Sequence, residues 1–340
     1  MFDINTLVDR MFDADPYLEA HRQALVRRMA HIQGMRRKIT EGRMDLLDLA
    51  SGHEYFGLHQ TADGWTFREW APNATAIFLV GDFSGWKEDR ALALTRLSDD
   101  GQWEIRLPGD ILRHGDLFRL RMHWRGGQGD RIPAYARRVV QDPGTLIFNA
   151  QVWAPDSPYR WRHPDFTRPD RPPLVYESHA GMAQDAEKIG TWREFTANVL
   201  PRIVDAGYNT IQLMAVQEHP YYGSFGYHVS SFFAPSSRFG PPEDLMNLID
   251  SAHEQGLAVI MDLVHSHAVR NELEGLATLD GTRHQYFHGG ERGEHTAWDS
   301  LCFDYGKIQV LHFLLSNCRF WLDEYHFDGY RFDGITSMLY

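Results

Sequence analysis

HFDGYRFDGITS, at residues 326–337, predicts a short strand that gives way to a loop. The run is too short for a helix, and Gly334 breaks the pattern directly after Asp333. Residues two apart on a strand point to the same side, so Arg331 and Asp333 are expected to project together. The guanidinium then favours an ionised carboxylate that can act as a nucleophile. A structural ion pair at a strand end has the same pattern, and this stretch alone leaves both interpretations open.

LAVIMDLVHSH, at residues 257–267, predicts a second strand. Its continuous apolar run is typical of a strand buried on both faces, as in a parallel sheet. Asp262 lies near the end of this run. Because a buried carboxylate needs a partner, Arg331 is the candidate.

Strand and helix patterns alternate over residues 173–340. The expected strands cover residues 174–178, 210–215 and 257–264 and the stretch that ends at Asp333. Such alternation predicts βα units around a parallel sheet. Four units correspond to half of a (β/α)8 barrel, so the predicted fold is the N-terminal half of a truncated TIM barrel.

Three further regions precede the half barrel. Residues 1–50 have the pattern of a helical segment, and residues 51–154 alternate in short strands with turn signals, which predicts a β-sandwich. Residues 155–172 are rich in Pro and Arg and are interpreted as a linker. The chain is therefore predicted to be multidomain.

The composition and the N-terminal sequence argue against several classes of partner and location. The net charge of −12 argues against nucleic acid and anionic membranes as partners, and no apolar run reaches membrane-spanning length. The N-terminus lacks the basic and apolar regions of a secretory signal, and Cys302 and Cys318 form no spaced framework. A cytoplasmic protein without a cofactor is expected, and Cys318 is expected to be a buried free thiol within a helix.

Two stretches resemble signature regions of glycoside hydrolase family 13, the α-amylase family. The first contains Asp262 and His267 at the spacing D-x-x-x-x-H, and the second is GYRFD at residues 329–333. The stretch SFFAPSSRFG at residues 231–240, with LVHSHA at 263–268 and WDS at 298–300, resembles the eukaryotic type of α-1,4-glucan branching enzyme. This resemblance covers nearly the whole chain. It implies a retaining transfer of an α-1,4-glucan segment to a 6-hydroxyl, with glycogen as the substrate.

The resemblance also implies roles for individual residues. Asp333 matches the nucleophile and Arg331 the residue that holds it ionised, while Asp262, His267 and Tyr227 match residues that bind the sugar. Gln309 and His312, near the start of the last helix, are weaker candidates for glucan contact. Ser266 stands where calcium-dependent amylases place an Asn ligand, so no metal is expected.

Residues 51–154 resemble the N-terminal carbohydrate-binding module of branching and debranching enzymes. The candidates for holding a glucan chain there are Trp70, Pro72, Trp86, Gln102 and Arg119. Core packing is the alternative for Trp70 and is preferred for Trp103. Trp86 lies in a loop bounded by Gly, where a sugar platform is preferred.

A retaining mechanism needs a second carboxyl group as acid and base, roughly 5 Å from the nucleophile. The family places that Glu after a fifth strand, so residues 1–340 alone are expected to be inactive. The full-length enzyme is expected to be a monomer. Two alternatives stay open: an amylase-like or debranching hydrolase, and a non-catalytic glucan-binding protein. The module and half barrel do not separate transfer from hydrolysis; only the resemblance does.

Overall fold

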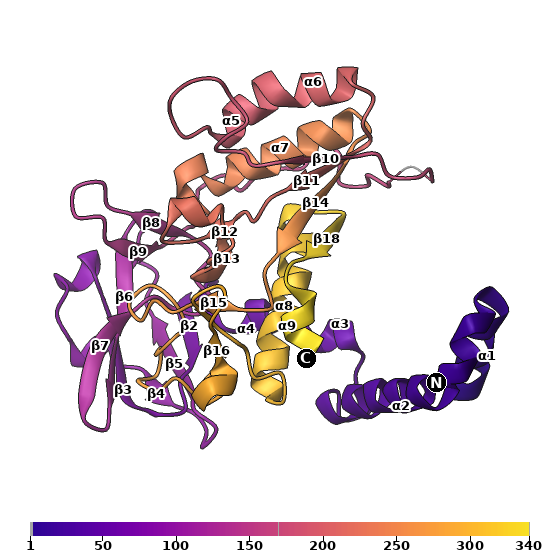
Figure 1. The fold of residues 1–340 in the computed structure, drawn as a ribbon. Coiled ribbons are helices and arrows are strands. Elements are labelled where there is room, and N and C mark those ends of the chain that lie inside the picture. The colour runs from indigo at the N-terminus through magenta and orange to yellow at the C-terminus, as the bar shows by residue number, and fades with distance from the viewer. Residues whose placement is uncertain (1–2, 169, 340) are drawn as a thin grey trace. The chain divides into compact units, whose positions relative to one another are not determined.

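The computed structural model describes residues 3–168 and 170–339 and divides into two compact units. The first unit ends at Ser51 and the second begins at Gly52 (Figure 1). Residues 1, 2 and 340, at the ends of the predicted helical segment and half barrel, and residue 169 of the predicted linker lie outside the described residues.

The first unit is helical, as predicted. Its elements are α1 (Ile4–Ala14), the 3-10 helix η1 (Pro16–His21), α2 (Arg22–Ile39) and α3 (Leu46–Leu49). Asp3 caps α1 by accepting from the amide of Thr6 at 3.1 Å, and Asp15 caps η1 in the same way. Arg22 forms an ion pair of 2.7 Å with Asp9, which ties α2 to α1.

The second unit begins with a short helix, α4 (Gly52–Tyr55), and a β-sandwich, which confirms the prediction for this region. One sheet has the order β1 (Gly57–Thr61), β2 (Gly64–Trp70), β5 (Gln102–Leu107), β4 (Thr95–Arg96). The other contains β3 (Ala74–Gly81), β6 (Leu117–Trp124), β9 (Phe148–Gln151) and β8 (Val139–Gln141), with β7 (Gly127–Arg131) paired to β6. Short 3-10 helices follow β3, at η2 (Asp82–Ser84) and η3 (Arg90–Leu92). Both sheets are antiparallel, and alternate residues such as Trp103, Ile105 and Leu107 face the core.

The remainder is the first half of a (β/α)8 barrel, as predicted. Its four parallel strands are neighbours in chain order: β10 (Val175–Ser178), β11 (Thr210–Leu213), β14 (Ala258–Leu263) and β18 (Gly329–Phe332). The connecting helices are α5 (Trp192–Glu194), which continues through the π-helical turn η4 (Phe195–Val199) into α6 (Leu200–Asp205), then α7 (Pro242–Glu254) and α8 (Ile308–Tyr325), with α9 (Ile335–Leu339) at the end. Figure 1 shows α6 and α7 along one side of this sheet.

Local sequence explains where these helices begin. Thr191 and Glu194 form a capping box that starts α5, and Pro242 occupies the first turn of α7. Glu243 and Asp244 lie in that first turn, where their negative charges interact favourably with the positive end of the α7 dipole. In α7 the apolar face of Leu245, Leu248, Ile249 and Ala252 is completely buried.

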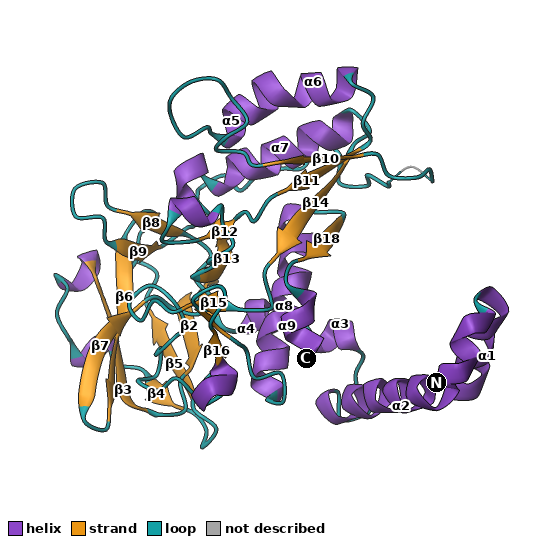
Figure 2. Cartoon of the chain, in the orientation of Figure 1, coloured by secondary structure: helices purple, strands orange, loops and turns teal. Residues whose placement is uncertain are grey.

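Two small sheets, which the sequence did not predict, lie in the loops after β11 and β14. One pairs β12 (Gln217–Glu218) with β13 (Ser231–Pro235), and the other has the order β15 (Ala268–Val269), β17 (Ser300–Leu301), β16 (Glu294–His295). The 3-10 helices η5 (Tyr222–Ser224), η6 (Ser237–Phe239) and η7 (Gly290–Gly293) belong to the same loops. Figure 2 shows β12, β13 and β15 between the sandwich and the barrel sheet.

The predicted linker contains no helix or strand among its described residues, yet it is fixed to α7. Asp250, which is completely buried, accepts hydrogen bonds from the hydroxyl of Tyr159 at 2.7 Å and the amides of Arg162 and His163 at 2.9 and 3.0 Å. Burial by itself raises the pKa of Asp250, but these donors outweigh it and lower the pKa well below its usual range. These contacts hold residues 159–163 of the linker against α7.

The sandwich and the loop after β14 share a buried interface around β2. The amide of Asn73 donates to Asp280 at 3.1 Å, and the side chain of Gln285 donates to the carbonyl of Trp70. The ring of Trp70 meets the ring of Tyr286 edge to face, with centroids 5.3 Å apart. Trp70 is therefore an interface residue between the sandwich and the barrel loops.

Glu69 is completely buried in the same interface. Its two carboxylate oxygens accept from the amides of Trp70 and Ala134, each at 2.9 Å, and no basic side chain in the described part of the chain pairs with it. Burial raises the pKa of Glu69 to about 7, although the two amide donors act in the opposite direction.

This burial makes stability depend on pH. The folded-state pKa lies above the unfolded value, so the folded chain keeps a proton that the unfolded chain releases, and stability falls as pH rises through 7. Glu69→Gln does not titrate. The free energy of unfolding of the variant minus that of the parent should therefore rise by about 2 kcal/mol between pH 5 and pH 8. Urea titrations at each pH measure this difference, and a constant difference would show that Glu69 stays ionised throughout.

No helix among the described residues has both the length and the apolar character that crossing a bilayer requires.

Candidate active site

A cavity of about 480 Å³ opens at the carboxyl ends of β14 and β18, beside the loops that follow β11 and β14. Its lining combines aromatic, imidazole and charged side chains. The lining residues are Tyr221, Gly223, Ser224, Tyr227, His228, His267, Trp298, Arg331 and Asp333. This end of the strands is where barrel enzymes carry their active sites.

Arg331 and Asp333 meet as the sequence predicted. The Nη1 of Arg331 lies 2.8 Å from the Oδ1 of Asp333, and both side chains line the cavity. The amide of Asp333 donates to the carbonyl of Leu263 at 3.0 Å, which continues the β14–β18 pairing and fixes the position of Asp333. The cavity therefore contains an accessible carboxylate held by a guanidinium.

Asp262 is completely buried behind this pair. Its oxygens accept from the Nη1 of Arg331 at 3.3 Å, from the Nε2 of Gln212 at 2.8 Å and from the hydroxyl of Tyr227. Burial raises the pKa of Asp262, while Tyr227 and Arg331 act to lower it. The predicted partnership with Arg331 is confirmed. With no exposed surface, Asp262 orients Tyr227 and Arg331 and does not itself reach the cavity.

Tyr227 lines the cavity because its loop is tightly folded against β11. Gly226 has φ +90°, and a Cβ there would lie 2.1 Å from the carbonyl oxygen of Ala215, so only glycine fits. Burial, followed by the hydrogen bond to Asp262, raises the pKa of Tyr227, which keeps its phenol protonated.

His267 also lines the cavity, with both ring nitrogens engaged. Its Nε2 lies 2.9 Å from the carbonyl of Tyr227 and its Nδ1 lies 2.9 Å from the hydroxyl of Ser266. A carbonyl can only accept, so Nε2 carries the proton and Nδ1 accepts from Ser266. Burial lowers the pKa of His267 to about 4, so the ring is neutral at pH 7. A hydrogen bond from Nε2 to a sugar therefore has to replace or share the bond to Tyr227.

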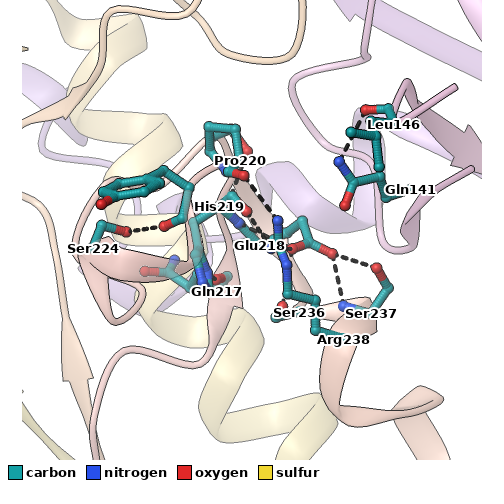
Figure 3. Close-up of polar contacts among 12 residues, drawn as sticks. Gln141, Leu146, Gln217, Glu218, His219, Pro220, Ser224, Ser236, Ser237 and Arg238 are labelled. Atoms are coloured by element: carbon teal, nitrogen blue, oxygen red, sulfur yellow. Dashed lines mark hydrogen bonds and ion pairs between the residues drawn. The ribbon is translucent and has the colours of Figure 1, made fainter. Parts of the chain in front are cut away.

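A buried carboxylate anchors the loop that carries Tyr227. Glu218 accepts from the amide and hydroxyl of Ser237, both at 2.7 Å, from the hydroxyl of Ser236 at 2.9 Å, from the amide of His219 at 3.1 Å and from Arg238 at 3.3 Å (Figure 3). Figure 3 also shows Arg238 reaching the carbonyls of His219 and Pro220. Glu218 and Arg238 thus clamp the base of the loop, which sequence reasoning did not detect.

Trp298, which belongs to the WDS motif but was not predicted as a site residue, lines the same cavity as Asp333. It is 41% exposed, and its ring stacks on His295 with centroids 4.2 Å apart and planes 5° apart. The Nε2 of His295 in turn lies 2.8 Å from the hydroxyl of Ser337 in α9, the short helix that follows Asp333 and Gly334. Tyr221 and His228 line the same cavity and were likewise missed, because their loop gives no periodic signal.

The structure does not bring Gln309 and His312 to this cavity. Both lie in the first turns of α8, where Gln309 is exposed and His312 packs edge to face on Phe56 with centroids 6.2 Å apart. Their predicted contact with glucan therefore concerns a surface outside the cavity around Asp333.

The predicted glucan-binding residues of the sandwich are in different environments. Trp86 is partly exposed, and its indole N–H donates to Asp82 at 3.2 Å. Trp70 is buried in the interface described above, and Arg119 is buried with its guanidinium donating to Asn149 at 2.9 Å. Neither of these two presents a face to solvent, so a role in holding glucan has no support in their positions.

Pro72 and Gln102 are partly exposed next to each other in the fold. A Cβ on Gly101, the neighbour of Gln102, would lie 2.2 Å from the Cα of Pro72. Gln102 accepts from the hydroxyl of Tyr55 at 3.3 Å. Trp103 is in the core, as preferred from the sequence.

Comparison with known proteins gives two family matches. Residues 55–143 match carbohydrate-binding module 48 (isoamylase N-terminal domain), and residues 180–296 match the alpha amylase catalytic domain. The chain is 45% identical over 332 residues to 1,4-alpha-glucan-branching enzyme of Dictyostelium discoideum, which covers 96% of this chain and 48% of that protein. It is 46% identical over 339 residues to the enzyme of the same name from Emericella nidulans, covering 97% of this chain and 49% of that protein.

Solved structures show the same fold at lower identity. A pullulanase from Bacillus acidopullulyticus aligns with a TM-score of 0.68 and 21% identity, covering 82% of this chain and 38% of that chain. The catalytic module of the pneumococcal virulence factor SpuA aligns with a TM-score of 0.65 and 18% identity, covering 86% of this chain and 50% of that chain.

The chain spans about half the length of the curated relatives it matches. One part of it is similar to carbohydrate-binding module 48 and another to the alpha amylase catalytic domain, and over nearly all its length the chain is similar to about half of the 1,4-alpha-glucan-branching enzymes.

Proposed function

We propose that the protein is a 1,4-alpha-glucan-branching enzyme in which this chain supplies the glucan-binding module and the nucleophile. The observation that carries the proposal is the Arg331–Asp333 pair at the carboxyl end of the fourth barrel strand, in a chain 43–47% identical to branching enzymes. The substrate is an α-1,4-glucan such as glycogen.

The proposed chemistry is a double displacement with retention. Asp333 attacks the anomeric carbon of an α-1,4 bond and forms a glycosyl ester, while an acid protonates the leaving 4-oxygen. A 6-hydroxyl of another glucan then gives its proton to the conjugate base of that acid and attacks the same anomeric carbon, which breaks the bond to Asp333, frees its carboxylate and forms the α-1,6 branch. Among the residues lining the cavity, Asp333 is the only carboxylate, so the acid and base come from outside this lining.

Each side chain at the cavity has a place in this proposal. Arg331 keeps Asp333 ionised and oriented, and Asp262 orients both Arg331 and the ring of Tyr227, on which a sugar can stack. His267, neutral at pH 7, lies beside the same sugar. None of these roles uses a metal or a cofactor.

Hydrolysis is the alternative, because the likeness to a pullulanase and to SpuA extends over the same fold. The two reactions differ in what they do to chain ends. With amylose as substrate, transfer should lower the iodine absorbance while the concentration of reducing ends stays constant. A rise in reducing ends that parallels the loss of iodine staining would identify a hydrolase.

A relative from Arabidopsis thaliana, 45% identical over 338 residues, is named 1,4-alpha-glucan-branching enzyme 2-2, chloroplastic/amyloplastic, so the cytoplasm stays a prediction for the compartment of this protein. A monomeric state and the lack of nucleic-acid and membrane partners also stay predictions.

Trp86 provides a test of the module. Trp86→Ala should weaken retention on glycogen several-fold, because an indole face that can stack on a glucose ring is lost. Turnover of short soluble glucans should be unchanged, since Trp86 is not among the residues that line the cavity. Affinity electrophoresis through glycogen measures the retention.

The matched control is Tyr17→Ala, which removes an aromatic side chain that is 92% exposed in the first unit. Equal mobility of the Trp86 variant and the parent in glycogen gels would rule out this platform.

A further inference from the structure

Four polar side chains form a continuous row across the barrel sheet, one from each strand. Glu177 comes from β10, Gln212 from β11, Asp262 from β14 and Arg331 from β18. Glu177 pairs in register with Gln212, and Asp262 with Arg331. At the end of this row, the Nη1 of Arg331 lies 2.8 Å from the Oδ1 of Asp333. Glu177 and Gln212 are thus connected to the candidate nucleophile, although neither lines its cavity.

Gln212 joins the two carboxylates of this row. Its Nε2 donates to the Oε1 of Glu177 at 3.0 Å and to the Oδ1 of Asp262 at 2.8 Å. The amide orientation is fixed by chemistry, because carboxylates only accept and the opposite flip would direct an oxygen at both of them. An amide nitrogen has two hydrogens, so one group satisfies both acceptors.

The second carboxylate oxygen of Asp262, Oδ2, contacts the residues that line the cavity. Oδ2 accepts from the hydroxyl of Tyr227 and from Arg331, whereas Oδ1 has Gln212 as its donor. A carboxylate turns about one bond, so the donor on Oδ1 determines how Oδ2 meets Tyr227 and Arg331. Arg331 then transmits this orientation to Asp333.

We propose that Gln212 is a positioning residue that sets the orientation of Asp262, and through it the orientation of Tyr227, Arg331 and Asp333. This inference rests on the proposed function for its kinetic consequences, while the hydrogen bond itself can be tested without turnover. Glu177 holds the second hydrogen of the Gln212 amide and so keeps the amide from rotating away.

The charged and titratable groups around Asp262 set the expected pH behaviour. They are Glu177 on β10, Tyr227 in the loop after β12, and Arg331 and Asp333 at the end of β18. Burial already raises the pKa of Asp262. Losing the Gln212 donor therefore favours protonation further, whereas a carboxylate at position 212 would be a like charge between Glu177 and Asp262.

Two substitutions of nearly the same size separate these effects. In the full-length protein, Gln212→Leu and Gln212→Glu should each lower kcat by about 10- to 100-fold at pH 7 and change KM by less than about threefold, because remote misplacement of the reacting groups affects the chemical step. The kcat of Gln212→Leu relative to the parent should fall from pH 8 to pH 5, since Asp262 protonates earlier. The same ratio for Gln212→Glu should rise, since a protonated Glu can again donate one hydrogen bond.

The matched controls are Gln255→Leu and Gln255→Glu, which make the same changes at an exposed glutamine that ends α7. Both should follow the parent at every pH. The positioning role is supported if the kcat ratio of variant to parent changes with pH in opposite directions for the two variants at position 212. General damage to packing would lower both kcat ratios but would not give opposite pH dependences. Parallel slopes, or kcat values within threefold of the parent, would overturn it.

Thermal unfolding tests the hydrogen bond between Gln212 and Asp262 without a measurement of activity. The deficit in Tm of Gln212→Leu relative to the parent should grow from pH 5 to pH 8, because an ionised Asp262 lacks one donor. If the parent protein transfers no glucan, the proposed function is wrong. The Tm measurement still tests the hydrogen bond in that case. A deficit that does not depend on pH would contradict the contact between Gln212 and an ionised Asp262.

Discussion

Asp333→Asn in the full-length protein should reduce the formation of α-1,6 bonds by about 10⁴-fold or more. The amide keeps the size of the side chain and an oxygen that can accept from Arg331, so the cavity keeps its shape. It cannot form the glycosyl ester, because an amide oxygen is a far weaker nucleophile than a carboxylate. Initial rates of branch formation measure the loss, and retention on glycogen should be unchanged.

Asp299→Asn is the matched control for this variant. Its carboxylate is 85% exposed, lies next to Trp298 in the sequence, and does not line the cavity. The control should keep the activity of the parent. Branching by Asp333→Asn within tenfold of the parent would remove Asp333 from the role of nucleophile.

Glu218→Leu should destabilise the second unit by about 3–5 kcal/mol, because it removes one partner of a buried ion pair and several hydrogen bonds. The amides of His219 and Ser237 would be left without their acceptor, and Arg238 would keep only its bonds to main-chain carbonyls. Denaturant titration followed by tryptophan fluorescence measures the change. Proteolysis should also become faster within the loop that carries Tyr227.

Glu291→Gln, at an exposed glutamate in η7, is the control for loss of a carboxylate and should leave the denaturant midpoint unchanged. Glu218→Gln should lie between the control and the leucine variant, since one oxygen can still accept. An unaltered midpoint for Glu218→Leu would mean that the clamp contributes nothing to stability.

Local patterns were sufficient to predict the barrel strands and the Arg331–Asp333 pair. The two residues are close in sequence and share one face of a short strand, so their contact follows from strand geometry alone. The partnership of Asp262 with Arg331 spans 69 positions, yet it was predictable because a buried carboxylate requires a donor. The sandwich followed from the alternation of its strands in the same way.

Contacts set by distant segments were not predictable. Trp70 was a candidate platform because residues 51–154 resemble a carbohydrate-binding module, but Gln285 and Tyr286, more than 200 positions later, cover it. Arg119 was a candidate from the same resemblance, whereas the structure pairs it with Asn149 across the sheet. Burial of this kind depends on which segments pack together, and the local sequence does not specify it.

Gln212 was not among the site residues predicted from the sequence. Of the four residues of β11 it alone is not buried, and only the structure shows that its amide lies between Glu177 and Asp262. The contacts of Glu218 were likewise not predictable, because the residues that donate to its side chain lie directly after it or 18 to 20 positions later in an irregular loop.

The central claim, that Asp333 forms the covalent bond to the sugar, is tested most directly by trapping the ester. A 5-fluoroglycosyl fluoride of a maltooligosaccharide forms such an ester faster than the ester breaks down, and the full-length protein can then be digested and analysed by mass spectrometry. We predict that the glycosyl mass is found on the peptide containing Asp333 and is absent in Asp333→Asn. A glycosyl group on another carboxylate, such as Glu177, or equal labelling of the variant, would contradict the account.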